Sequence, residues 1–118
     1  MWISRQMKSR GEDSTMQTAR VTLDEGGDIE AVGVGVDRGV SLFTPYGYTC
    51  RLPAGEEVFI AKNGGMQAGL GVRMKESVKS GEIKISSPFG SYIHLKSDGS
   101  VVINGLVIDK NGTVINGE

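Results

Sequence analysis

The sequence predicts an all-β protein, with an OB-fold-like barrel over residues 18–76 and a short intertwined β-helix or β-prism over residues 77–118. From residue 18 onward, apolar residues alternate with polar ones in short runs separated by turn residues, as in half-buried strands. Glycine makes up 18 of the 118 residues, about twice its usual share of ~7%. No window combines the apolar stripe, capping residue and stop signal of a helix.

Residues 1–17 are polar and of mixed charge, and they show no sustained period. We expect them to form a flexible N-terminal arm. They lack the ~7–15-residue apolar core of a secretory signal, and the single cysteine, Cys50, has no partner for an internal disulfide. We therefore expect a protein that is made in the cytoplasm without a signal peptide.

The predicted barrel rests on apolar pairs at alternate positions, among them Val21 with Leu23 and Val58 with Ile60. Turn residues separate these runs at Glu25–Asp28, Thr44–Gly47 and Asn63–Gly65. Short strands at this spacing favour a small closed barrel, with the five-stranded OB-fold as the leading candidate.

The residue pattern changes from Gly81 onward, because glycines recur there at short intervals, at positions 81, 90, 99, 105, 112 and 117. Short β-type runs lie between them, and SDGSVVING at 97–105 returns as the shorter KNGTVING at 110–117. Regularly spaced strands with glycine at the corners are typical of a β-solenoid or an intertwined fibre.

This second segment has too little chain to enclose its own apolar side chains. An isolated hairpin is marginally stable in water, and open edges pair readily with another chain. We therefore expect several copies to wrap around a common axis. The predicted core residues lie in pairs on one face: Ile83 and Ile85, Ile93 and Leu95, Val101 and Ile103, and Leu106 and Ile108.

Residues 19–65 and 71–105 resemble the Mu-type central spike protein of contractile phage tails, the baseplate assembly protein V family. The motifs that carry the resemblance are Pro45-Tyr46-Gly47, then RLPAGEEV at 51–58, Gly64-Gly65, Gly81-Glu82-Ile83, and SPFGSYIHLKSDGSVVI at 87–103. The order and spacing of these motifs match those of the family along most of the chain.

The resemblance implies a homotrimer whose core holds the eight residues named above, at the tip of the tail tube in the virion. Such a spike docks on baseplate hub or tail-tube proteins, contacts the bacterial envelope transiently during piercing, and can carry an apex-capping protein. Several members bind iron through a His-x-His pair. Residues 109–118, DKNGTVINGE, contain no such pair, and His94 is the only histidine. We therefore expect no metal site.

No constellation of residues indicates catalysis, so we expect no enzyme activity and no cofactor. Glu56 and Glu57 are adjacent, so on a strand their carboxylates point to opposite faces. Cys50 has no histidine nearby in the sequence to activate it, and we expect a small residue at a strand end. His94 has no second ligand nearby, and we expect an exposed strand histidine.

The alternative function is an OB-fold module that binds single-stranded nucleic acid. Phe43, Tyr46, Tyr48 and Phe59 would then form the stacking platform. Residues 18–76, however, hold six basic and eight acidic side chains, and the net negative charge opposes phosphate binding. We therefore interpret these aromatics as core and turn residues, and expect no nucleic-acid partner.

Overall fold

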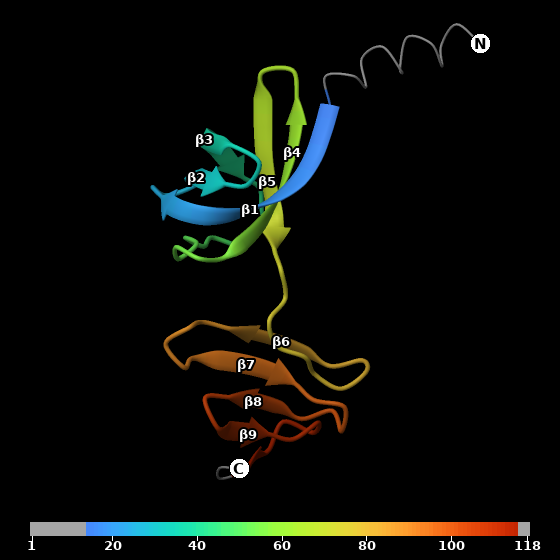
Figure 1. Cartoon of the computed structure of the whole chain (residues 1–118). Coiled ribbons are helices and arrows are strands. Elements are labelled where there is room, and N and C mark those ends of the chain that lie inside the picture. Colours follow the sequence, from blue (N-terminus) through green and yellow to red (C-terminus); the bar gives the residue numbers. More distant parts are fainter. Residues whose placement is uncertain (1–13, 116–118) are drawn as a thin grey trace, which may run out of the picture. The chain divides into compact units, whose positions relative to one another are not determined.

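The computed structural model describes residues 14–115, which form an all-β protein, as the sequence predicts. Within this range no residue is helical. The chain divides into two compact units after Met74, close to the predicted boundary after residue 76. Figure 1 shows the barrel of the first unit and the sheet of the second.

The first unit is a closed five-stranded barrel, consistent with an OB-fold-like barrel. Its strands are β1 (Ser14–Asp24), β2 (Asp28–Val32), β3 (Val36–Leu42), β4 (Glu57–Asn63) and β5 (Met66–Val72). They follow the order β1-β2-β3-β5-β4, and β4 pairs with β1 to close the barrel. The β3–β5 pairing is parallel, while the other neighbours are antiparallel.

The barrel core follows from the alternation of apolar residues. The inward-facing residues are Ala19, Val21, Ile29, Ala31, Val40, Val58 and Ile60, and Leu52 packs against them. Gly69 on β5 leaves room for this packing. A Cβ atom there would lie 3.3 Å from both Ile29 Cδ1 and Val58 Cγ2.

The long β1 strand corrects the predicted extent of the N-terminal arm. β1 begins at Ser14, and residues 14–17 pair with Asn63, Lys62, Ala61 and Ile60 of β4. The β4–β5 hairpin supplies hydrogen-bond partners that a reading of residues 1–17 alone does not reveal. Residues 1–13 of the predicted arm lie outside the described part of the chain.

Asp24 connects the β1–β2 turn to the long loop between β3 and β4. Its Oδ1 accepts hydrogen bonds from the backbone N–H groups of Gly26 and Gly27, both at 3.0 Å, and its Oδ2 accepts one from Leu52 at 2.6 Å. Burial raises the pKa of Asp24, but the bonds from Leu52, Gly27 and Gly26 outweigh it, so the net pKa is below its ordinary value.

The second unit is a five-stranded antiparallel meander. Its strands are β6 (Ile83–Ser86), β7 (Tyr92–Leu95), β8 (Val101–Ile103), β9 (Leu106–Ile108) and β10 (Val114–Ile115), and each pairs with the next. They coincide with the short β-type runs between the predicted glycine corners.

Tight turns connect the strands of this meander. Lys96 N–H donates to Ser100 O and Gly99 N–H donates to Lys96 O, and Asp109, Gly112 and Thr113 repeat the pattern. Gly99 has a φ of +87°, a left-handed conformation that glycine adopts without strain. A Cβ atom there would also lie 3.0 Å from Lys110 Cβ, so the two corners approach closely.

Candidate interaction face of the second unit

The strand register places the eight predicted core residues on one face of the β6–β10 sheet. Directly paired residues in antiparallel strands point to the same side. One row across the sheet runs Ile83, Leu95, Val101, Ile108 and Val114, and the neighbouring row runs Ile85, Ile93, Ile103 and Leu106. Val114 is thus a ninth member of this face, beyond the eight residues predicted from the sequence.

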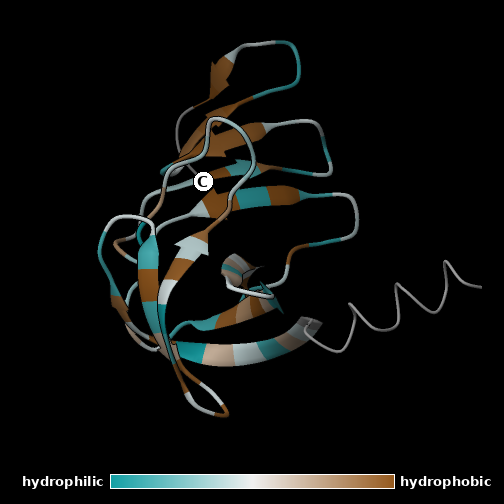
Figure 2. Cartoon of the chain, turned by 90° about the horizontal axis from the view of Figure 1, so that it is seen from above, coloured by the Kyte–Doolittle hydropathy of each residue, from teal (hydrophilic) through white to brown (hydrophobic). Residues whose placement is uncertain are grey.

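This face, which we call the apolar face, is largely uncovered by the residues that the structure describes, with Val101 and Ile108 partly buried. Ile83, Ile85 and Val114 are 56%, 52% and 58% exposed, and Ile93, Leu95, Ile103 and Leu106 are 40–43% exposed. In Figure 2, brown hydrophobic stretches lie mostly on the strands, where teal hydrophilic residues interrupt them, and the connecting loops are mostly white or teal. A continuous set of exposed aliphatic side chains on a sheet marks an interaction site.

The opposite face is mixed and is covered in part by the chain's own residues: it carries Lys84, Tyr92 and His94, but also Val102, Val107 and Ile115. Lys84 on β6 forms an ion pair with Glu76 at 3.0 Å, and its ammonium lies 5.0 Å from the centre of the Tyr92 ring. Val102, also on this face, is completely buried. The two faces therefore differ in degree: the apolar face holds seven aliphatic side chains that are 40–58% exposed, whereas among the aliphatic strand residues of the opposite face only Ile115, at 47%, is comparably exposed within residues 75–115.

Glu82 is an acidic group that bonds to His94 on this opposite face. Its carboxylate is only 4% exposed and accepts hydrogen bonds from Ser97 N–H at 2.8 Å, His94 Nε2 at 3.0 Å and Lys79 N–H at 3.3 Å. The bond from Ser97 is the main reason that the pKa of Glu82 falls to about 2. Glu82 thereby connects the segment before β6 to β7 and to the following corner.

The position of His94 corrects the prediction of an exposed strand histidine. Its side chain is 19% exposed and bonded to Glu82. A partner twelve residues away in the sequence is brought beside it by the β6–β7 pairing, and local spacing does not reveal that contact. The predicted strand face, opposite to Ile93 and Leu95, agrees with the register.

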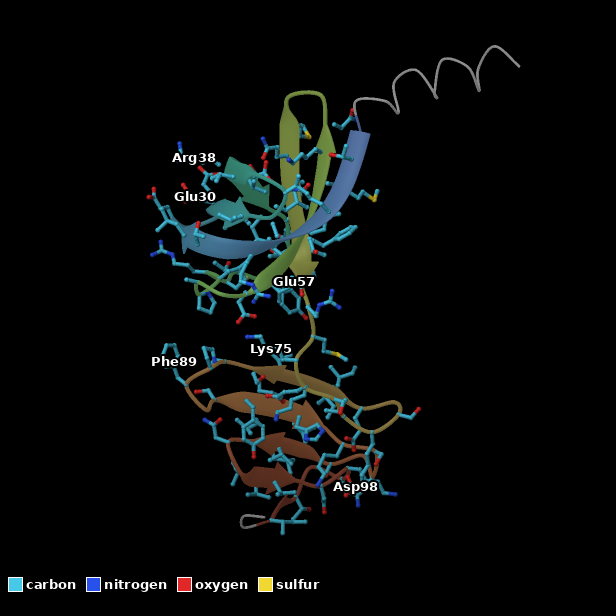
Figure 3. All side chains as sticks on the ribbon, viewed as in Figure 1. Glu30, Arg38, Glu57, Lys75, Phe89 and Asp98 are labelled. Atoms are coloured by element: carbon cyan, nitrogen blue, oxygen red, sulfur yellow. The ribbon has the colours of Figure 1, made fainter. Side chains whose placement is uncertain are left out.

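Of the prediction that the barrel aromatics are core and turn residues, the core part requires correction, whereas Tyr46 does lie in a turn. Phe43, Tyr46 and Tyr48 are 57%, 103% and 58% exposed, and Phe59 is 39% exposed. Small aliphatic side chains fill the barrel core, so the rings lie on the surface. Figure 3 labels a further aromatic residue, Phe89, in the β6–β7 corner, where it is 93% exposed.

Two further candidate residues of the barrel lie in an ion pair and in a loop. Glu57 forms an ion pair with Arg73, and the hydrogen bond from Arg73 is the main reason that the pKa of Glu57 lies below its ordinary value. Cys50 is exposed and lies in the β3–β4 loop, not at the predicted strand end. Among residues 14–115, no group of three or more His, Cys, Asp or Glu side chains is arranged to hold a metal ion.

The described residues contain no helix long and apolar enough to cross a membrane. No protein-family model matches the chain, and no curated protein or solved structure matches it significantly.

Proposed function

We propose that the protein is the homotrimeric central spike of a contractile-tail baseplate, located in the virion at the tip of the tail tube. The observation that carries this proposal is the uncovered apolar face of β6–β10, on which the register gathers Ile85, Ile93, Ile103 and their neighbours. The resemblance of residues 19–105 to the Mu-type spike family supports it independently.

The energetics favour burial of this face against other copies of the chain. Removing the exposed half of an aliphatic side chain from water contributes about 1 kcal/mol. The seven side chains of this face that are 40–58% exposed in one copy would thus contribute on the order of 7 kcal/mol before the entropic cost of association is subtracted. Three copies around one axis would bury the apolar faces at the centre and leave the opposite faces, which carry Lys84 and His94, outside.

The proposed mechanism is mechanical. A trimeric β-structure with paired backbone groups transmits axial force when the sheath contracts, and the tip contacts the bacterial envelope transiently. The barrel is proposed to dock on a baseplate hub or tail-tube protein, and an apex-capping protein is a further proposed partner. Neither catalysis nor a cofactor enters this mechanism.

The test compares two neighbouring residues on opposite faces of β6. Ile85→Asp would place three carboxylates beside the proposed axis, where unpaired like charges are costly to bury. Because Ile85 is 52% exposed in the single chain, the substitution costs an isolated copy little. We expect wild-type protein to have the mass of a trimer in light scattering and Ile85→Asp to have the mass of a monomer.

Ser86→Asp provides the matched control. Ser86 is exposed and pairs with Tyr92 on the opposite face, so the same added charge should leave the trimer intact. A monomeric wild-type protein at micromolar concentration would overturn the proposal, as would two variants that both remain trimeric.

One observation favours the alternative of a single-stranded nucleic-acid module. Tyr48 and Arg51 line an open groove of about 420 Å³ on the barrel, and stacking on aromatic rings beside a basic side chain is a common mode of binding. A gel shift with labelled single-stranded DNA at low and high salt separates the two functions. We expect no shift, because acidic residues outnumber basic ones in the barrel.

A further inference from the structure

A second uncovered apolar surface lies on the barrel, at strands β4 and β5. It is an open groove of about 530 Å³. Among the residues that line it, Phe59, Leu70, Val72 and Met74 are 39%, 51%, 42% and 80% exposed. We call this surface the barrel groove. Its aliphatic and aromatic walls favour an apolar occupant.

The charged residues of the barrel groove already neutralise each other. Glu57 and Arg73 are joined by an ion pair, and Figure 3 labels Glu57 on β4. An occupant that covers the groove therefore does not bury an unpaired charge. An occupant can cover the apolar walls while this pair stays intact at the rim.

Residues 1–10 of the chain have the composition that such a groove requires. They contain Trp2, Ile3 and Met7, three basic side chains and no acidic one; Glu12 and Asp13 follow, so residues 1–13 together have a net charge of 3 − 2 = +1. Residues 14–74 hold five basic and seven acidic side chains, a net charge of 5 − 7 = −2. Attraction between opposite charges would guide this segment to the barrel.

We propose that residues 1–10 of this chain bind in the barrel groove, with Trp2 and Ile3 against Phe59 and Leu70. The reach of the chain permits this. Thr18 lines the groove and follows Ser14 by four residues in β1, a distance of about 13 Å. The thirteen residues before Ser14 span up to about 45 Å when extended, which is enough to turn back to the groove of the same copy.

Charge favours this occupant over the barrel of a second copy. Two barrels carry the same negative net charge, so their surfaces repel at low ionic strength. The N-terminal segment carries the opposite charge and is covalently attached, which gives it a high effective concentration at the groove.

The experiment uses the fluorescence of Trp2, the only tryptophan of the chain. In the intact protein we expect emission at a shorter wavelength than in the urea-unfolded chain, because the indole is shielded from water. Leu70→Lys removes an apolar wall and repels the basic segment, so its emission should shift to the wavelength of the unfolded chain. Trypsin should also cleave after Arg10 faster in this variant than in wild type.

Val34→Lys is the matched control, because Val34 is 95% exposed in the β2–β3 turn and does not line the groove. It should leave Trp2 emission and tryptic cleavage unchanged. If Leu70→Lys fails to fold, Met74→Lys tests the same groove from a position outside the strands. The proposal is overturned if wild-type emission equals that of the unfolded chain, or if folded groove variants leave a short-wavelength emission unchanged.

A measurement of oligomeric mass distinguishes failure of the N-terminal segment proposal from failure of the spike proposal. A monomer with shielded Trp2 contradicts only the spike, and a trimer with exposed Trp2 contradicts only the arm. If Leu70→Lys lowers the oligomeric mass and leaves Trp2 emission unchanged, the groove is occupied by a second copy and the arm proposal is wrong.

Discussion

Single carboxylates organise the loops of both units. Asp24 accepts three backbone N–H bonds from Gly26, Gly27 and Leu52, and Glu82 accepts bonds from Lys79, His94 and Ser97. Charge-assisted bonds of this kind are stronger than neutral ones. Each carboxylate therefore holds segments that strand pairing alone does not join.

Gly69 shows how closely the barrel is packed at the scale of one methyl group. We expect Gly69→Ala to destabilise the protein by about 1–3 kcal/mol, because a Cβ atom would crowd Ile29 and Val58. Urea unfolding followed by circular dichroism measures this change.

Gly65→Ala is the control for this experiment, since a Cβ atom there meets nothing within 4 Å. It should change the free energy of unfolding by much less than Gly69→Ala. Equal stability of Gly69→Ala and wild type would show that Ile29 and Val58 move aside without cost.

At the scale of the element, the β6–β10 sheet depends on a carboxylate that must remain ionised. The pKa of Glu82 is about 2 in the folded protein, against an ordinary value of 4.5, mainly because of the Ser97 bond. A lowered folded-state pKa contributes stability above pH 4.5 that is lost as the pH falls from 4.5 towards 2.

Glu82→Gln should therefore lower the thermal midpoint of the sheet most at neutral pH, and the difference from wild type should shrink as the pH approaches 2. Amide hydrogen exchange at Ser97 should become faster in the variant at neutral pH, because its N–H loses a charged acceptor. Glu25→Gln, on an exposed residue of the β1–β2 turn, is the control. A difference between Glu82→Gln and wild type that does not vary with pH would contradict the role of this carboxylate.

At the scale of the whole molecule, the two uncovered apolar surfaces are proposed to have different occupants. The apolar face of the sheet has edge strands and nine aliphatic side chains, as expected for association of identical copies. The barrel groove is smaller and suits a short segment of the chain itself.

Association predicts that stability depends on protein concentration. Because a trimer is favoured by mass action, the thermal midpoint of wild-type protein should rise over an about hundredfold range of concentration. The midpoint of Ile85→Asp should not change with concentration. Scanning calorimetry across a dilution series makes this comparison, and a constant wild-type midpoint together with a monomeric mass would contradict association.

Much of the local structure could be predicted from the sequence, because strand alternation and glycine corners are local signals. The alternation within Ile83–Ile85 and Ile93–Leu95 was sufficient to assign those side chains to a shared face, and the glycines at 90, 99, 105 and 112 marked the corners. The inward positions of Val21, Val58 and Ile60 followed from the same period of two.

Strand pairing and burial were decided only by the tertiary structure. The closure of β1 on β4, the start of β1 at Ser14 and the bonds from His94 and Ser97 to Glu82 join residues that are distant in sequence. The exposure of Tyr46 and Tyr48 likewise depends on which side chains fill the barrel. A sequence pattern specifies the face of the strand to which a side chain points. The hydrogen-bond partner and the burial of that side chain depend on the segments that the fold brings beside it.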